Sequence, residues 1–417
     1  MHEPLTAPAG PVAPQDRILT LDVLRAFALL GILVMNMPAF YSSFWDPRPP
    51  HERWPGGADR VAWWAMDTFF SGKFNSLFAF LFGVGFSLQL ERLMARAAHP
   101  VGVYMRRLIV LLLIGVAHGV FLWIGDVLHM YALLGLLLVV LRRASDRTLL
   151  AIVVVGLLVP TFFSIHQLFT YTAANEQTDR GLFTYIGTLV NTAHSGGTYV
   201  DVVRSNIAQY RVIYTDIRGY LAFPSLFLTI LLGFVFGRRG YLKDPVAHGR
   251  FWRHLLVTCL VVGLGSALTF SLGAPHLVPF KPGVLDVVVM TAYSLARPAL
   301  MLFYASAIVL LVQSDRWGPR LAGLAPMGRM PLTNYLMQTL ICTTIFNAYG
   351  LGLWNTVGPA GGFGLAVVIY VVQIFWSRWW FTRFAFGPME WLWRALTYGG
   401  APSMKRSPVE ATQHEPA

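Results

Sequence analysis

The chain reads GVAHGVFLWIGDVLHMYAL from Gly115 to Leu133, between the aliphatic runs 108–117 and 132–141. A helix that crosses a bilayer needs about 20 mostly apolar residues, and each run approaches this length with its flanks. The stretch therefore predicts two membrane helices joined by a tight turn at residues 123–126.

Three ionisable side chains, His118, Asp126 and His129, fall within this apolar stretch. Such groups are costly at membrane depth unless they are paired or face a wet cavity, so each is a candidate functional residue. The alternative is that Asp126 and His129 lie in a short, wet outer turn. That alternative is weaker for His118, which lies well inside the run.

The composition of the whole chain is that of a membrane protein. Of 417 residues, 55% are hydrophobic and 12% are charged, and the mean hydropathy is +0.55. Soluble domains carry about 25% charged residues. The net charge of +12 does not indicate nucleic acid, because the basic residues fall between apolar runs rather than in one patch. Orientation in the lipid bilayer explains them better.

The predicted fold is an all-α, polytopic bundle of about ten transmembrane spans. We expect them at residues 18–38, 73–91, 106–124, 127–142, 148–166, 219–238, 252–273, 286–312, 332–350 and 362–381. Arginine and lysine gather in alternate connections, so the positive-inside rule predicts that both termini are cytoplasmic.

The transmembrane helical domain is expected over residues 18–399, between disordered tails at residues 1–17 and 400–417. The tails are polar or rich in proline and lack a core-forming pattern. Two connections, residues 39–72 and 166–218, are long enough to form outer segments that do not cross the membrane.

Polar residues recur at two depths of the bundle. With a rise of 1.5 Å per helical residue, Asn36, His118 and Asp126 share a level in its outer half, and Lys73 begins a span there. Whether they share a cavity is left open.

At the inner level, Asp22 and Arg25 are spaced to pair on one helix face. Asn334, Tyr335 and Gln338 form a polar stripe near the inner end of another span. Both sets have a structural alternative, as an ion pair and as hydrogen bonds that join helices.

Several familiar motifs are absent. The sequence has no P-loop, and no Cys-x-x-Cys pair or His-x-x-Glu-His site. We therefore expect neither ATP-driven transport by this chain alone nor a tightly bound metal. A partial Gly-x-Gly pattern over residues 82–86 lies inside a span, which favours close helix packing over phosphate binding.

Blocks along nearly the whole chain resemble the YeiB-like family of bacterial membrane proteins, whose domain is known as domain of unknown function 418. The blocks are LDVLR with GILVMN (21–36), KFNSLF with LFG (73–83), His118 with WIGDVL and YA (118–132), MPLTNY (330–335), YGLGL (349–353) and GPMEWLWR (387–394). The resemblance implies a multi-pass protein of the bacterial cytoplasmic (inner) membrane.

That family is similar at the superfamily level to transmembrane acyltransferases such as heparan-alpha-glucosaminide N-acetyltransferase. In that enzyme an asparagine at the end of the first span and a loop histidine serve catalysis. Asn36 matches the asparagine. The loop histidine has no good match, because His51 lies further along and is flanked by prolines and a glutamate. His118 is therefore expected to carry that role.

The resemblance implies acyl-CoA, acetyl-CoA foremost, as the co-substrate. His118 would be the general base, Asp126 would orient it, and Asn36 would stabilise the oxyanion, a role worth about 3 kcal/mol in comparable sites. The acceptor would be a hydroxyl or amine of a glycan or lipid-linked group at the outer side. The residues expected to bind acyl-CoA are Arg25, Lys73, Arg329, Asn334, Tyr335 and Gln338.

Two other classes stay open. A proton-coupled transporter or exporter of a small molecule would use the same polar residues to bind substrate or relay protons, with His118 and Asp126 as the coupled pair. In a scaffold or assembly factor they would be structural. The sequence also leaves the oligomeric state open, a homodimer included.

Overall fold

The computed structural model describes residues 18–46, 48, 50–96, 99–215, 222–277 and 282–405. The expected tail over residues 1–17, and residues 406–417 of the other tail, lie outside the described residues. In the described ranges the chain is helical, and its only extended pairing is an isolated bridge between Phe384 and Lys405. The all-α prediction is confirmed.

The helices follow one another along the chain with short connections. Their bounds are α1 Leu19–Tyr41, α2 Pro50–Arg53, α3 Gly57–Phe69, α4 Lys73–Arg96, α5 Pro100–Phe121, α6 Leu128–Leu141, α7 Asp146–Gly156, α8 Val159–Thr170, α9 Ala173–Gly196, α10 Tyr199–Thr215, α11 Ala222–Arg238, α12 Gly249–Gly273, η3 Ala274–His276, α13 Val284–Val312, α14 Gly318–Ala322, α15 Ala325–Arg329, α16 Pro331–Phe346, α17 Pro359–Arg383 and α18 Pro388–Tyr398.

Seven helical segments of the described chain are long and apolar enough to cross a membrane: Leu19–Tyr41, Gly57–Ala95, Pro100–Phe121, Asp146–Thr170, Gly249–His276, Val284–Val312 and Pro359–Arg383. α6 and α11 are apolar but shorter, and α16 has 16 residues. Each of the ten expected spans contains a helix. However, α3 leads into α4, α8 continues α7 and η3 continues α12, so three of the segments are composite.

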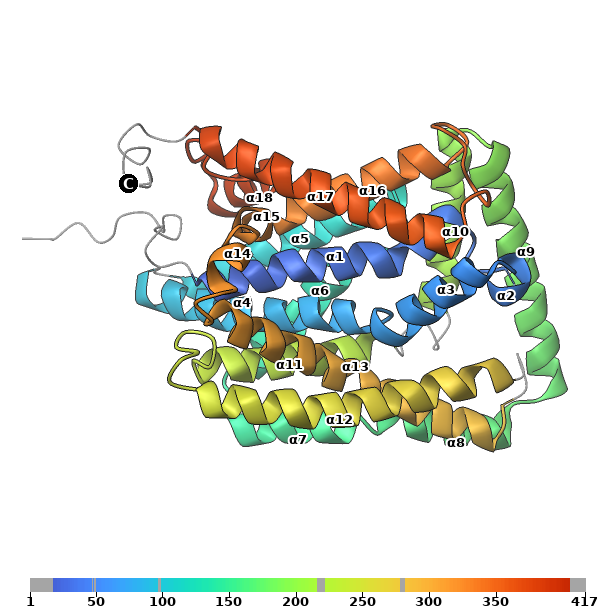
Figure 1. Cartoon of the computed structure of the whole chain (residues 1–417). Helices are drawn as coiled ribbons and strands as arrows, with labels where there is room; N and C mark the ends of the chain where they lie inside the picture. The colour runs from blue at the N-terminus through green and yellow to red at the C-terminus, as the bar shows by residue number, and fades with distance from the viewer. Residues whose placement is uncertain are drawn as a thin grey trace, which may run out of the picture.

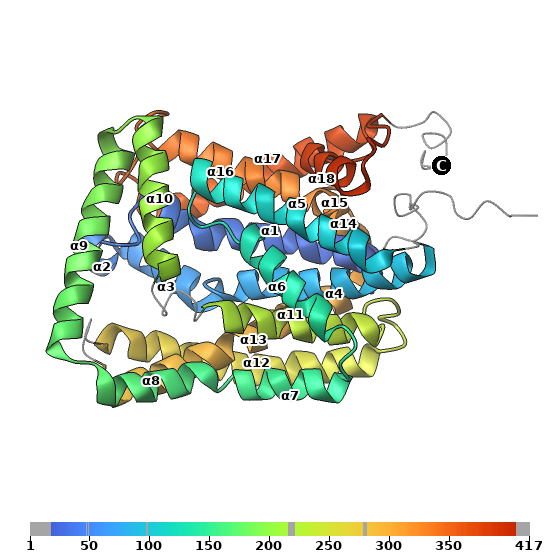
Figure 2. The same cartoon turned by 180° about the vertical axis from the view of Figure 1, so that it is seen from behind.

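The long helices lie side by side, and each end of the bundle has its own set of short or crossing helices (Figures 1 and 2). At one end α9 and α10 stand across the bundle as a cap, formed by the expected outer segment 166–218. At the other end α14, α15 and α18 gather near the start of α1. α1 lies in the middle and contacts α4, α13, α15, α16 and α17.

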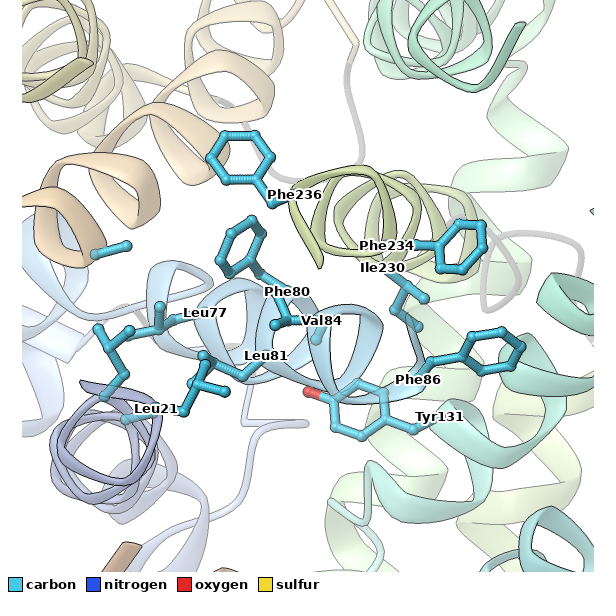
Figure 3. Packing of buried hydrophobic residues seen from close by; sticks show 14 of the residues in the cluster. Leu21, Leu77, Phe80, Leu81, Val84, Phe86, Tyr131, Ile230, Phe234 and Phe236 are labelled. Atoms are coloured by element: carbon cyan, nitrogen blue, oxygen red, sulfur yellow. The ribbon is translucent and has the colours of Figure 1, made fainter. Parts of the chain in front are cut away.

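The centre of the bundle is filled by aromatic and aliphatic side chains, many from α4 and α11 (Figure 3). The two helices approach so closely that a Cβ on Gly83 would lie 2.1 Å from the Ile230 carbonyl oxygen, and one on Gly233 would lie 2.0 Å from that of Phe80. Only glycine fits such a contact between helix backbones. The packing interpretation of Gly83 is therefore confirmed.

Candidate functional site

Asp126 lies between two histidines inside the bundle. Its Oδ1 is 2.8 Å from Nδ1 of His118, and its Oδ2 is 2.6 Å from Nδ1 of His129. The Asp126 side chain is 0% exposed and that of His118 1%. The alternative that Asp126 and His129 occupy a wet turn is therefore wrong, because the turn folds back against α5 and excludes solvent.

The local sequence explains this fold-back. α5 ends with backbone N–H groups of Leu122 and Trp123 donating to the His118 carbonyl. Gly115 on α5 lets the connection approach, since a Cβ there would lie 2.3 Å from the backbone nitrogen of His129 and 2.9 Å from Oδ2 of Asp126. The His129 backbone N–H then donates to Oδ2 at 3.0 Å. The expected hairpin and its tight turn are present.

These contacts select the tautomer of each neutral imidazole. An ionised carboxylate only accepts hydrogen bonds, so both histidines carry their proton on Nδ1 when neutral. Nε2 of His118 then holds a lone pair, and this buried atom has no hydrogen-bond partner among the described residues. A neutral histidine oriented by a carboxylate, with Nε2 free, is the arrangement of a general base.

The cap extends this cluster. Nε2 of His129 is hydrogen-bonded to the Tyr214 hydroxyl of α10, and the ring of Tyr210 stacks on that of Tyr214 with centroids 5.3 Å apart. The site is thus completed by a helix 85 residues away in the sequence. The spacing of His129 three residues after Asp126 was the available sequence signal, and nothing local pointed to the tyrosines.

A cavity of about 360 Å³ opens near the end of the bundle that lies opposite the cap. Five arginines from five elements line it: Arg25 of α1, Arg92 of α4, Arg107 of α5, Arg329 of α15 and Arg394 of α18. Asp22 and Glu390 are the carboxylates in the lining. Positive charge therefore exceeds negative charge around this cavity.

Both carboxylates are engaged by the protein. Asp22 pairs with Arg25 at 2.8 Å, as their spacing predicted. Glu390 caps α16: its Oε1 accepts from the backbone N–H of Leu332 at 2.7 Å, and its Oε2 accepts from the Thr333 hydroxyl at 2.6 Å. Burial raises the pKa of Glu390, and the hydrogen bonds from Thr333 and Leu332 partly oppose that rise.

The deep part of the cavity is apolar and ends beside the histidine cluster. Its lining there includes Phe82, Leu111, Leu128, Tyr131 and Tyr335. The Tyr335 ring is 5.2 Å from the His118 ring, centroid to centroid. A molecule in the cavity would thus have the arginines at one end and the neighbourhood of His118 at the other.

The residues expected to bind acyl-CoA lie in three environments. Arg25, Arg329 and Tyr335 line the cavity. Asn334 and Gln338 join α16 to α17 instead. Asn334 Nδ2 donates to Ser377 Oγ at 3.2 Å, and Gln338 Nε2 donates to Gln373 Oε1 at 2.9 Å. For these two residues the structure agrees with the alternative role, hydrogen bonds that join helices.

Lys73 and Asn36 lie elsewhere. Lys73 is buried at the start of α4, outside the cavity lining. Asn36 lies one helical turn before Phe40, whose ring packs on Trp123 at 4.3 Å. It is therefore at the end of α1 that faces the Asp126 turn. Within the described ranges its side chain forms no hydrogen bond with His118 or Asp126.

Replacing Glu390 by Gln is expected to destabilise the fold by about 1–2 kcal/mol, because the charge-assisted bonds to the α16 N-terminus become neutral ones. Thermal unfolding in detergent measures this. The control is Glu91→Gln, which removes an exposed ion pair with Lys243 and should change stability by less than about 0.5 kcal/mol. Equal effects of the two substitutions would contradict the capping role.

Comparisons with known proteins identify relatives of this chain. A family described as "Protein of unknown function (DUF418)" matches residues 236–400. The uncharacterized protein YxaH of Bacillus subtilis is 33% identical over 404 residues, covering 93% of this chain and 96% of YxaH. The uncharacterized protein YeiB of Escherichia coli is 31% identical over 412 residues, covering 93% and 97%. No solved structure matches the chain. The apolar helices are those of a multi-pass membrane protein, and similarity over almost the full length of these relatives shows that the chain belongs to the YeiB-like DUF418 family.

Proposed function

We propose that this protein is an integral-membrane acyltransferase. It moves an acyl group from cytoplasmic acyl-CoA to a hydroxyl or amine of a glycan or lipid-linked acceptor at the outer side of the bacterial cytoplasmic membrane. The observation that carries the proposal is the cavity that runs from five arginines to Tyr335, the neighbour of the His118–Asp126 pair.

The arginine end suits the nucleotide part of coenzyme A. That molecule carries a pyrophosphate and a further phosphate, and guanidinium groups bind phosphate through paired, charge-assisted hydrogen bonds. The positive-inside rule assigns this arginine-rich end to the cytoplasm, where acyl-CoA is found. The apolar lining beyond it suits the pantetheine arm and the acyl group.

The histidine cluster supplies the chemistry of transfer. Nε2 of His118 takes the proton of the acceptor hydroxyl or amine, and the acceptor atom bonds to the acyl carbon. The carbon–sulfur bond of the thioester then breaks, and the coenzyme A thiolate leaves and recovers the proton from His118. Asp126 holds the imidazole in the required tautomer and stabilises its transient charge. Asn36 is assigned to the oxyanion, because it matches the catalytic asparagine at the end of the first span of the acyltransferases that the family resembles.

Replacing Arg329 by Gln is expected to weaken acetyl-CoA binding about ten- to hundredfold, because one hydrogen bond to a charged group is worth about 1.5–3 kcal/mol. Binding is measured by calorimetry on protein in detergent. The control is Arg204→Gln, an exposed residue of α10 at the opposite end of the bundle, which removes the same charge and should leave the Kd unchanged. Identical Kd values for the two variants would contradict the placement of coenzyme A.

A second candidate is a proton-coupled transporter or exporter. The hydrogen-bonded series His118, Asp126, His129 and Tyr214 favours it, because it connects the core to the cap and could relay a proton. Proteoliposomes separate the two candidates. Thioester cleavage without proton flux supports acyl transfer, whereas substrate-dependent loss of a pH gradient without cleavage supports transport.

A further inference from the structure

A second group of cations lies where α4 begins beside α13, outside the arginine-lined cavity. Lys73 is 0% exposed. Its Nζ is 5.9 Å from the centroid of the Tyr293 ring, and Cζ of Arg297 is 5.2 Å from the same centroid. Lys73 and Arg297 thus face one aromatic ring and act on each other electrostatically.

Both cations have donors left over. Nζ of Lys73 donates to the Asp67 carbonyl at 2.9 Å, and an ammonium has three donors in all. Nε of Arg297 is buried and has no hydrogen-bond partner among the described residues. Within the same ranges neither cation forms an ion pair within 4.0 Å.

One carboxylate acts on Lys73. Asp67 attracts Lys73 electrostatically, but it lies beyond ion-pair distance, and its carboxylate forms no hydrogen bond within the described part of the chain. Neither cation is therefore neutralised by an ion pair among the described residues, and positive charge is left inside the bundle. Buried charges are normally paired, so these two cations lack the anion that would neutralise them.

The backbone brings further positive potential to the same point. Gly72 has φ +74°, and a Cβ on it would lie 2.7 Å from Nε of Arg297. The turn therefore approaches the guanidinium as closely as glycine allows. It leads into the N-terminus of the 24-residue helix α4, whose dipole favours an anion.

The depth of the group argues against an accidental surface pair. Arg297 lies near the middle of α13, Val284–Val312, so about 20 Å of helix separates it from either end.

We propose that Lys73 and Arg297 bind an oxyanion, a phosphate or carboxylate group, at this depth. The site is distinct from the arginine-lined cavity and does not depend on acyl transfer.

Thermal unfolding of the purified full-length protein tests the proposal. The probes are inorganic phosphate and acetate, each compared with chloride at equal ionic strength, and phosphatidylglycerol compared with phosphatidylcholine. Wild-type protein should gain about 3 °C or more in Tm with an oxyanion that fits, because a ligand bound only to the folded state stabilises it. Arg297→Gln and Lys73→Gln should lose most of that gain.

Two controls separate this site from the cavity and from general effects. Arg329→Gln should lose only the part of a phosphate gain that comes from the arginine-lined cavity and keep the part that Arg297→Gln loses. Arg316→Gln at an exposed position should keep the whole gain. Asp67→Asn removes the carboxylate that competes with the ligand, so it should tighten oxyanion binding about tenfold. Because Asp67→Asn should strengthen oxyanion binding whereas Lys73→Gln should weaken it, the test stays informative even if Lys73→Gln fails to fold.

The probes also identify the source of the anion. A gain with phosphate or acetate indicates a free ion, and a gain with phosphatidylglycerol alone indicates a lipid headgroup. The proposal is overturned if every probe shifts the Tm of wild type and of Arg297→Gln equally. It is equally overturned if no probe shifts the wild type.

Discussion

Replacing His118 by Ala is expected to slow acetyl-CoA turnover by about 10³-fold while acetyl-CoA binding stays within about twofold. The reason is geometric. Nε2 of His118 is the unpartnered end of an imidazole held by Asp126 at 2.8 Å, whereas the arginines that would bind coenzyme A lie at the other end of the cavity. Hydrolysis of the thioester by purified protein measures turnover, and calorimetry measures binding.

Asp126→Asn is the matched variant for this prediction. It keeps the volume of the side chain but no longer requires the proton of His118 to be on Nδ1, so turnover should fall by a comparable factor. Retention of more than a tenth of the wild-type rate by His118→Ala would remove His118 from the mechanism. Loss of acetyl-CoA binding in the same variant would instead contradict the separation of the binding and reacting ends.

Replacing Gly83 by Val is expected to cost at least about 3 kcal/mol of stability, more than ordinary overpacking of a core. The new Cβ would meet the Ile230 carbonyl at 2.1 Å, and a backbone carbonyl cannot rotate away as a side chain can. α4 and α11 would have to separate, which opens the core shown in Figure 3. Thermal unfolding and the yield of monodisperse protein measure the effect.

Gly85 provides the control on the same helix. It lies two residues further along, and a Cβ there meets nothing within 4 Å. Gly85→Ala should therefore leave stability within about 0.5 kcal/mol of wild type. If Gly83→Val were as stable as Gly85→Ala, the close contact between α4 and α11 would not be part of the folded protein.

The sequence by itself determined the features that depend on neighbouring residues. Hydropathy runs predicted the helices, because an apolar stretch of that length must satisfy its own backbone hydrogen bonds in lipid. Spacing along one helix predicted the Asp22–Arg25 pair, which is present at 2.8 Å. The turn between α5 and α6 brought His118 and Asp126 together for the same reason, since only seven residues separate them.

Tertiary structure alone decided which distant residues meet. Tyr214 reaches His129 because α9 and α10 stand across the end of the bundle (Figure 1). No local pattern specifies the angle of that cap. Likewise, Tyr335 faces His118 while its neighbour Asn334 joins α17, because the rotation of α16 about its axis directs successive side chains to different partners.

The placement of the charged residues was likewise decided partly by the sequence and partly by the tertiary structure. Composition predicted that arginines would gather on one side of the membrane, because each basic connection obeys the positive-inside rule independently. Only the packing of five elements brings five arginines around one cavity and leaves Lys73 and Arg297 apart from it. Hydropathy and charge bias are properties of a segment, whereas a binding site is a property of how segments are rotated and packed against one another.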